Sequence, residues 1–278
     1  MRRSSLPALV AALALGATLA AAAPAVPGAG ADASTAAVGT PAAPDTFTIA
    51  TYNIRHGRGM DDVVDLTRTA TAIAALGADV VALQEVDRGV ERSDGADEPR
   101  VLGERLGFEH AFGAFFPYQG GEYGMAILSR FPIRRSLPLR LPDGNEPRVA
   151  LVAEVELPSG RRVQVVNVHF DWVENDTLRY AQVQALGEVL DTTSLPTILL
   201  GDFNDVPGSR TLERWRDRFT AAAKPTDDRL TFSSTEPVKE IDHILLGPPG
   251  AWGPATSRVV SDPMTSDHRA VVAEVRLR

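Results

Sequence analysis

The stretch from Leu199 to Asp205 constrains the fold of this chain most. An apolar run over 197–200 leads into Gly201, and the polar side chains of Asp202 and Asn204 follow at once. A short apolar run bounded by a glycine is typical of a buried strand. In α/β proteins, ligands bind beyond the carboxyl ends of such strands. We therefore expect Asp202 and Asn204 to lie at a binding edge, where the other polar clusters of the chain also meet.

The same arrangement occurs twice along the chain. A β-rich segment ends at Asn53, a helical pattern follows, and an apolar run leads to Glu85. Later, a β-rich segment ends at His169, a helical pattern follows, and the run described above leads to Asp202. Alternating strands and helices favour an α/β (α+β) organisation, whereas several hairpin-like strands argue against a fully parallel sheet. We expect two mixed sheets packed face to face, with helices outside and polar strand ends at one rim.

Apolar periodicity and turn residues predict the remaining elements. The segment 86–98 is charged and is expected to be a loop, and Ser209 is expected to cap a helix. The predicted strands cover 46–54, 79–83, 123–129, 133–141, 148–157, 162–168, 197–200, 241–246, 258–260 and 270–277. The predicted helices cover 65–76, 99–106, 176–190 and 209–219.

The N-terminal segment has the pattern of a secretory signal peptide. Arg2 and Arg3 precede an alanine-rich apolar run over 6–23, and an A-x-A-like cleavage site follows at 29–31. We predict a signal peptide over 1–31, a secreted protein, and no stable membrane span after cleavage. The alternative is an uncleaved anchor, because the run approaches the ~20 residues that cross a bilayer. Residues 32–45 are rich in Ala, Pro, Gly, Ser and Thr and are predicted to be a disordered linker, followed by one domain over 46–278.

Composition narrows the classes of function. The chain carries a formal net charge of −8 and no cysteine, so no disulfide stabilises it. Binding of nucleic acid comes largely from Lys and Arg on phosphates, which an acidic chain disfavours. A cation site built from carboxylates tolerates such a charge.

Six polar clusters lie at predicted strand ends or just before the last strand. Each alone has a structural explanation, because carboxylates after strands cap helices and turns, and histidines there are commonly structural. Capping does not explain all six in this order. They are Asn53 in TYNIR, Glu85 in LQE, His169 in NVH, Asp202 with Asn204 in GDFN, Asp242 in IDHI, and Asp267 with His268 in SDH.

In these motifs and their order, the chain resembles the endonuclease/exonuclease/phosphatase superfamily. That group includes deoxyribonuclease I, exonuclease III, inositol polyphosphate 5-phosphatases and bacterial sphingomyelinases. The resemblance extends from about Thr46 to the C-terminus. It implies a four-layered α/β/β/α sandwich like that of deoxyribonuclease I, and hydrolysis of phosphoester bonds with a divalent metal.

Oxygen-rich side chains predict where such a metal binds. Mg²⁺ prefers oxygen ligands and keeps several waters, so one or two carboxylates suffice. Glu85 is the foremost candidate ligand, with Asn53 beside it and Asp267 as a third. The absence of Cys argues against zinc. We expect Mg²⁺, with Mn²⁺ or Ca²⁺ as alternatives.

The resemblance implies catalytic roles for five further residues. Asp202 would orient or deprotonate the attacking water, and Asn204 would contact phosphate or a second metal. His268 would bind a phosphate oxygen or act as a base, and Asp242 would hold its ring. His169 would stabilise the charged transition state by hydrogen bonding.

Contacts with the rest of the substrate are less defined by the sequence. Arg148 could reach phosphate or equally be a surface arginine, whereas His56 and Trp172 could line the rim and the mouth. His243 is expected to be structural, because alternation along a strand turns it away from Asp242. An aromatic segment over 110–118 could pack in the core or grip an apolar group.

Three functions remain open on the sequence. The first is a secreted phosphoesterase that acts on a small-molecule or lipid head-group phosphoester. The second is an extracellular endonuclease or exonuclease that cleaves DNA or RNA. The third is a folded binding module without turnover, which the filled polar positions weaken. We expect a monomer.

Overall fold

The computed structural model describes residues 45–278. The predicted signal segment over 1–31 and all but the last residue of the predicted linker lie outside the described residues. The first strand begins at Asp45, which the sequence assigned to the linker. None of the helices in the described part of the chain is long and apolar enough to cross a bilayer.

The chain forms two mixed sheets of six strands each. The first sheet contains, in spatial order, β11 (Ser257–Val260), β12 (Ala270–Leu277), β1 (Asp45–Asn53), β2 (Val80–Arg88), β4 (Gly121–Ser129) and β3 (Glu109–Tyr118). The second contains β5 (Ile133–Arg140), β6 (Val149–Glu156), β7 (Arg162–His169), β8 (Thr197–Asp202), β10 (Asp242–Gly247) and β9 (Thr220–Ala221).

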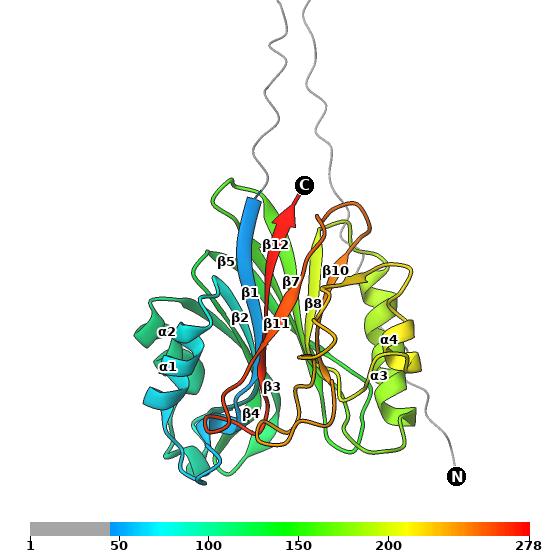
Figure 1. Ribbon diagram of the computed structural model, residues 1–278. Coiled ribbons are helices and arrows are strands. Elements are labelled where there is room, and N and C mark those ends of the chain that lie inside the picture. The colour runs from blue at the N-terminus through cyan, green and yellow to red at the C-terminus, as the bar shows by residue number, and fades with distance from the viewer. Residues whose placement is uncertain (1–44) are drawn as a thin grey trace, which may run out of the picture. The chain divides into compact units, whose positions relative to one another are not determined.

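Helices cover the outer face of each sheet (Figure 1). Helices α1 (Leu66–Ala75) and α2 (Glu98–Leu106) lie beside the first sheet, and α3 (Thr177–Leu190) and α4 (Arg210–Glu213) lie beside the second. Single-turn 3₁₀ helices, η1 (Arg55–Gly57) and η2 (Glu91–Ser93), follow β1 and β2. The predicted four-layered α/β/β/α sandwich is therefore confirmed.

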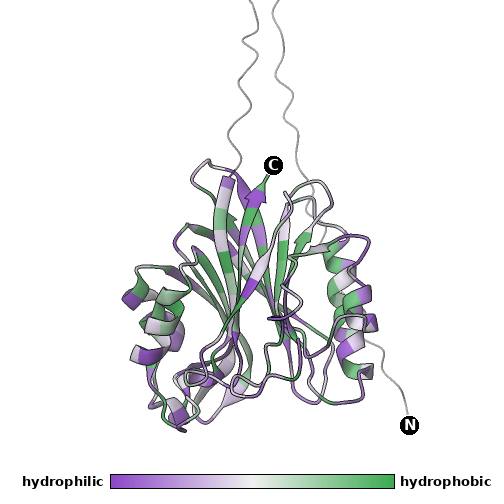
Figure 2. Cartoon of the chain, viewed as in Figure 1, coloured by the Kyte–Doolittle hydropathy of each residue, from purple (hydrophilic) through white to green (hydrophobic). Residues whose placement is uncertain are grey.

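Three hydrophobic clusters hold the layers together. The largest lies between the sheets and includes Ile49, Met125, Leu151 and Ile198. The other two fill the spaces between each sheet and its helices. Figure 2 shows hydrophobic residues concentrated along the central strands and hydrophilic residues on the outer sides of the helices. Burial of apolar surface on both faces of each sheet is the main stabilising contribution in such a fold.

The repeated strand–helix–strand arrangement is present in both sheets. Strands β1 and β2 pair in parallel, with Asn53 opposite Gln84, and β7 and β8 pair in parallel, with His169 opposite Asp202. Helix α1 connects the first pair and α3 connects the second. The carboxyl ends of these four strands point to the same end of the sandwich (Figure 1), as the sequence predicted.

A buried polar bridge crosses the sheets just beneath that end. Gln84 Nε2 in the first sheet donates a hydrogen bond at 2.6 Å to Asn167 Oδ1 in the second. Asn167 Nδ2 donates back to the carbonyl oxygens of Leu83 and Ala126, both at 2.9 Å. Because an unpartnered buried amide is costly, this bridge favours one alignment of the two sheets.

Two local predictions were wrong. Ser209 caps a helix, but that helix ends at Glu213 instead of 219. The N–H groups of Trp215, Arg216 and Arg218 bond to carbonyls three residues back, which tightens the chain into turns. The charged segment after Glu85 is not a loop throughout, since β2 continues to Arg88. The aromatic segment forms β3, where Phe115 is buried in the central cluster and Phe116 and Tyr118 pack against it.

Candidate active site

Most of the predicted polar residues lie at the carboxyl ends of the parallel strands or at the start of their antiparallel neighbours. Asn53, His169 and Asp202 are the last residues of β1, β7 and β8. Asp242 begins β10 and stands directly opposite Asp202 in the antiparallel register. His268 lies two residues before β12, which pairs with β1. Two sheets thus supply one site.

Glu85 reaches the site through a β-bulge. The pairing of β2 with β4 shifts register between Gln84 and Val86, and Glu85 between them has a left-handed backbone with φ of 56°. A bulge re-aims the side chain of the extra residue, and bulges are common beside active sites. The sequence placed Glu85 at a strand end, whereas the strand in fact continues past it.

Asn53 joins the carboxylates of the two sheets. Its Nδ2 atom donates to Glu85 Oε1 at 3.0 Å and to Asp202 Oδ2 at 3.3 Å. Its Oδ1 atom accepts from the backbone N–H of Arg55 at 3.2 Å. Asn53 is fully buried, so these hydrogen bonds fix the positions of both carboxylates.

Asp267 brings a further carboxylate to the same place. Ser266 Oγ donates to the backbone oxygen of Asn53 at 2.7 Å and lies 3.3 Å from Asp267 Oδ1. Burial raises the pKa of Glu85, and the negative charge of Asp267 raises it further. Two half-buried carboxylates beside an amide oxygen match the ligands of a hard divalent cation. The donor set of Glu85, Asp267 and Asn53 therefore fits Mg²⁺.

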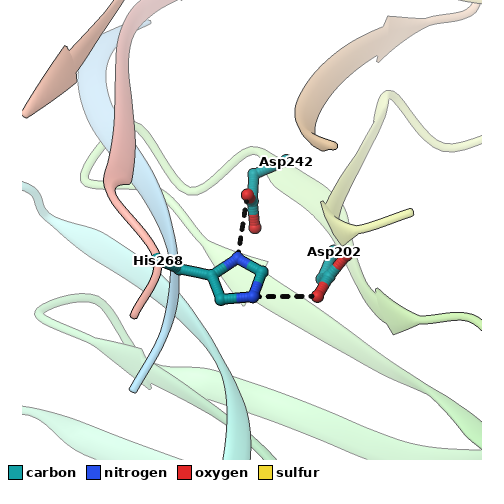
Figure 3. A group of neighbouring side chains, drawn as sticks. All are labelled: Asp202, Asp242 and His268. Carbon is teal, nitrogen blue, oxygen red and sulfur yellow. Dashed lines mark hydrogen bonds and ion pairs between the residues drawn. The ribbon is translucent and has the colours of Figure 1, made fainter. Parts of the chain in front are cut away.

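His268 is held between two aspartates (Figure 3). Its Nδ1 lies 3.1 Å from Asp242 Oδ2, and its Nε2 lies 3.7 Å from Asp202 Oδ2. Burial lowers the pKa of His268, but Asp242 and Asp202 outweigh burial and raise the pKa to about 10. Although ligand atoms of these three residues lie within 4.8 Å of one another, an imidazolium donates protons from both nitrogens and does not ligate a metal.

Asp202 is the buried carboxylate at the centre of the site. Burial raises its pKa to about 7, although hydrogen bonds from Asn204 and Asn53 and the charge of His268 act in the opposite direction. The backbone N–H of Asn204 donates to Asp202 Oδ1 at 2.8 Å. A carboxylate with a pKa near neutrality suits proton transfer.

The backbone around Asp202 requires a glycine before it. Gly201 has a φ of 144°, and a Cβ there would collide with the carbonyl group of Val168 on the paired strand. Asn204 has a left-handed φ of 51°, and its Nδ2 donates to the carbonyl oxygen of Phe170 at 3.0 Å. Asn204 lines the cleft.

His169 is neutral in this site. Burial lowers its pKa well below the usual value, and the charges of Arg148 and His268 lower it further. Its Nε2 lies 3.5 Å from Asp202 Oδ2. Its Nδ1 is buried without a hydrogen-bond partner in the described structure. A neutral imidazole can still donate one hydrogen bond, which is the role that the family resemblance implied.

Arg148 is buried, so the interpretation as a surface arginine is wrong. It is 1 % exposed, its guanidinium carbon lies 4.8 Å from the centre of the Phe115 ring, and Nη2 lies 3.1 Å from Glu146 Oε2. Its Nε and Nη1 have no hydrogen-bond partner among the described residues. A buried cation with free N–H groups beside a cleft is suited to an oxyanion ligand.

All of these groups except Asn53 and Asp242 line one cleft of about 800 Å³. Trp172 lines it, as the sequence suggested, whereas His56 does not. His56 is buried in η1, where burial and then Arg92 lower its pKa to about 4, so it remains neutral beneath the surface. His243 faces away from the site as predicted, with Nε2 3.1 Å from the Asp205 backbone oxygen.

Several lining residues carried no sequence signal. They include Tyr123, Glu146, Phe232, Lys239 and Ile241. Tyr123 lies in β4, beside the bulge that carries Glu85, and its placement depends on the pairing of distant strands. A pattern within one segment does not contain that information.

Comparison with known proteins agrees with this geometry. The model of the endonuclease/exonuclease/phosphatase family matches residues 50–268. The uncharacterized protein YbhP of Escherichia coli K12 is 27 % identical over 262 residues, which cover 84 % of this chain and 97 % of that protein.

Solved structures show the same fold at lower identity. A family protein of Bacteroides thetaiotaomicron superposes with a TM-score of 0.70 at 18 % identity, covering 85 % of this chain and 99 % of that one. The mannosyl-6-phosphatase Bt3783 of the same species gives a TM-score of 0.67 at 19 % identity, covering 82 % and 99 %. The match to the family model spans most of the chain, and the sandwich and its polar rim agree with it. This chain therefore belongs to the endonuclease/exonuclease/phosphatase family.

Proposed function

We propose that this protein hydrolyses phosphoester bonds of small or lipid head-group substrates with the help of a divalent cation, most suitably Mg²⁺. The observation that carries the proposal is the pair of hydrogen bonds from Asn53, which bring Glu85 of one sheet and Asp202 of the other into one site. Beside that pair, buried cationic and neutral donors face the same cleft.

Glu85, Asp267 and the amide oxygen of Asn53 would hold the cation. When bound, the cation would neutralise phosphoryl oxygens and the developing charge on the leaving oxygen. Without a cation, the half-buried carboxylates of Glu85 and Asp267 would repel an anionic phosphate. The pKa of Glu85, raised first by burial and then by Asp267, reflects the same unfavourable concentration of negative charge.

The remaining groups would act directly on water and phosphate. Asp202, held by Asn204 and Asn53, accepts a proton from the attacking water while the water oxygen bonds to phosphorus. The ester P–O bond breaks, and the alcohol leaves with its electron pair and takes up a proton from solvent water, while Asp202 later returns its proton to solvent. The His268 imidazolium and neutral His169 donate to the phosphoryl oxygens as charge develops there.

Arg148 would bind a non-bridging phosphate oxygen. Its side chain is already buried, so its free Nε and Nη1 atoms lose little hydration when an anion arrives. Phe115 and Glu146 hold the guanidinium in place. A positioned cation of this kind lowers the cost of bringing an anionic ester beside carboxylates.

The charges around the cleft favour a small or lipid phosphoester over nucleic acid. Six carboxylates line the cleft, against three Lys or Arg side chains. Of those three, Arg179 is already paired with Asp205 at 3.1 Å. Nucleic acid binding relies on several basic contacts with successive phosphates, which this lining does not supply.

The decisive experiment measures hydrolysis of p-nitrophenyl phosphate and bis-p-nitrophenyl phosphate with Mg²⁺, Mn²⁺, Ca²⁺ or EDTA. We expect turnover with a divalent cation and none with EDTA. Asp202→Asn, which removes the base, and His268→Gln, which removes a charged donor, should each lower kcat by about 10²–10³-fold. His110→Gln, a change at an exposed histidine, is the matched control. Activity that persists both in EDTA and in Asp202→Asn would reject the proposal, and preferential cleavage of plasmid DNA would favour a nuclease.

We also propose that the protein is exported. The support is the alanine-rich apolar run behind Arg2 and Arg3, with its A-x-A-like site. Cell fractionation followed by N-terminal sequencing of the mature protein tests this proposal. An intact N-terminus in the cytoplasmic fraction would contradict it.

A further inference from the structure

Exposed hydrophobic side chains gather at the end of the molecule where the cleft lies. Nine large hydrophobic side chains are exposed in the described part of the chain, and six belong to loops at the catalytic end. We call these six the apolar rim: Met60, Val63, Trp172, Val206, Val238 and Met264. Isolated exposed hydrophobic residues are ordinary, but a concentration at one end of the molecule indicates a contact surface.

Strand pairing shows that the rim loops share one end of the molecule. The loops follow β1, β7 and β8 or precede β10 and β12, and these strands pair so that all five loops lie at the lower end in Figure 1. The backbone N–H of Met60 donates to the Met264 carbonyl oxygen at 2.8 Å, which joins two of the loops. Val238 precedes Lys239, which lines the cleft.

The rim continues into the cleft. Trp172 and Val206 belong to the rim and also line the cleft, together with Val173, Phe232 and Ile241. The cleft thus has a charged floor, suited to phosphate, and an apolar outer wall. A phosphoester whose alcohol is apolar would keep its alcohol in contact with hydrophobic side chains along this wall.

Charge distinguishes among the surfaces that could lie against the rim. Four of the five rim loops carry a net negative charge, as in the segments 58–65 and 171–176, and in the fifth, before β12, two aspartates are offset by Arg269 and the His268 imidazolium. Polyanions such as nucleic acid, and membranes of anionic lipid, would be repelled. A net-neutral lipid surface would not be repelled by these loops.

The arrangement of the rim also fits a lipid surface better than a protein partner. The six side chains come singly or in pairs from five separate loops, and not from one face of a helix or strand. Separate apolar side chains, tryptophan among them, can each enter the boundary between head groups and acyl chains. We propose that the cleft takes a phosphoester of an apolar alcohol from a net-neutral lipid surface, on which the apolar rim rests. This proposal rests on the proposed function and names its substrate class.

A binding measurement tests the rim without relying on catalysis. The chain has three tryptophans, and of these Trp172 is 57 % exposed, whereas Trp215 and Trp252 are buried. In EDTA, phosphatidylcholine vesicles should shift tryptophan emission to shorter wavelength and protect it from iodide quenching. Trp172→Phe should abolish both effects, because the two buried tryptophans remain as the only fluorophores. An unchanged emission spectrum at saturating vesicle concentration would overturn the proposal.

Three valines provide matched substitutions. Val63 and Val238 belong to the rim and are 54 % and 72 % exposed, whereas Val189 is 44 % exposed and lies at the far end of α3. Val63→Asp and Val238→Asp should each weaken co-sedimentation of the full chain with phosphatidylcholine vesicles by about tenfold, because a charge replaces apolar contact. Val189→Asp should leave it unchanged. Equal effects in all three variants, or tighter binding to phosphatidylglycerol than to phosphatidylcholine, would contradict the proposal.

Activity measurements separate failure of this inference from failure of the proposed function. Val63→Asp should lower hydrolysis of vesicle phospholipid about tenfold and leave hydrolysis of soluble p-nitrophenyl esters unchanged. If vesicle binding is absent but soluble esters are hydrolysed, the rim proposal fails and the proposed function stands. If vesicles are bound and no ester is hydrolysed with any cation, the proposed function fails. A dimer seen by light scattering that Val63→Asp dissociates would instead show that the rim binds a second copy of the chain.

Discussion

The Nδ2 atom of Asn53 donates a hydrogen bond at 3.3 Å to Asp202 Oδ2, across the interface between the two sheets. The same nitrogen donates to Glu85 Oε1 at 3.0 Å, so both of its N–H groups are used on carboxylates. The amide therefore sets the spacing between the proposed metal ligand and the proposed base. No other type of side chain offers two donors and one acceptor oxygen in so short a group.

We predict that Asn53→Asp lowers kcat/KM for a soluble phosphoester by about 10²–10³-fold, because it replaces two donors with a third carboxylate. The measurement is steady-state hydrolysis over a range of Mg²⁺ concentrations, with circular dichroism to check the fold. Full activity at high Mg²⁺ would show that Asn53 serves only to bind the cation, contrary to this prediction.

Gly201→Ala should destabilise the fold as well as the site. The new Cβ would collide with the Val168 carbonyl group, and the φ of 144° is strained for alanine. We expect the free energy of unfolding to fall by about 3 kcal/mol or more, since a strained backbone and an overpacked contact add. Gly160→Ala is the control, because Gly160 has a φ of 84° but open space around it. Gly160→Ala should lower the free energy of unfolding only by the conformational strain of about 1 kcal/mol. If both variants lost the same free energy in urea unfolding, a collision at Gly201 would be refuted.

The buried bridge between Gln84 and Asn167 should contribute to stability. Asn167→Leu removes a donor from two backbone carbonyls and an acceptor from Gln84, so we expect a loss of about 3 kcal/mol in urea unfolding. Gln164→Leu, on the same strand but only half-buried, should cost less than about 1 kcal/mol.

A double-mutant cycle tests whether the two amides act together. Adding Gln84→Leu to Asn167→Leu should cost clearly less than the sum of the single changes, because each single change leaves the other amide unpartnered. Simple additivity would mean that the bridge is not a coupled unit.

Glu98 lies outside the site and should make the stability of the fold depend on pH. The carboxyl group is fully buried, its Oε2 accepts from the Asp87 backbone N–H at 2.9 Å, and its Oε1 has no partner in the described structure. Burial raises the pKa of Glu98 well above its usual value. A carboxyl group whose pKa is raised by folding contributes stability that is fully present below its pKa in the unfolded state. This contribution is lost as the pH rises through its pKa in the folded state.

The side chain introduced by Glu98→Gln does not titrate, so this variant should not lose stability at Glu98 as the pH rises. The free energy of unfolding of the variant, relative to that of the original protein, should therefore increase as the pH rises from about 4.5 to about 8. Urea titrations at several pH values measure this difference. A difference that does not change with pH would show that Glu98 does not titrate as proposed.

The sequence predicted the layers and most of the polar rim because their signals are local. Apolar runs that end in polar residues placed Asp202 and His169 correctly at strand ends. The bulge at Glu85 was missed because its left-handed backbone depends on pairing with β4. The burial of Arg148 was missed because it depends on Phe115, which comes from a strand of the other sheet.

Among the described residues, the two sheets share no strand. At the catalytic end they are connected by side-chain contacts and by backbone hydrogen bonds between the loops before β10 and β12, from Ser234 to Asp267 and from Arg269 to Thr231. A slide of one sheet along the other by one residue, about 3.3 Å, would part Asn53 from Asp202 without breaking a single ladder hydrogen bond. Turnover should therefore be more sensitive to the alignment of the two sheets than any measurement of secondary structure. Substitutions deep between the sheets, far from the phosphate site, should therefore lower turnover in a protein that is otherwise folded.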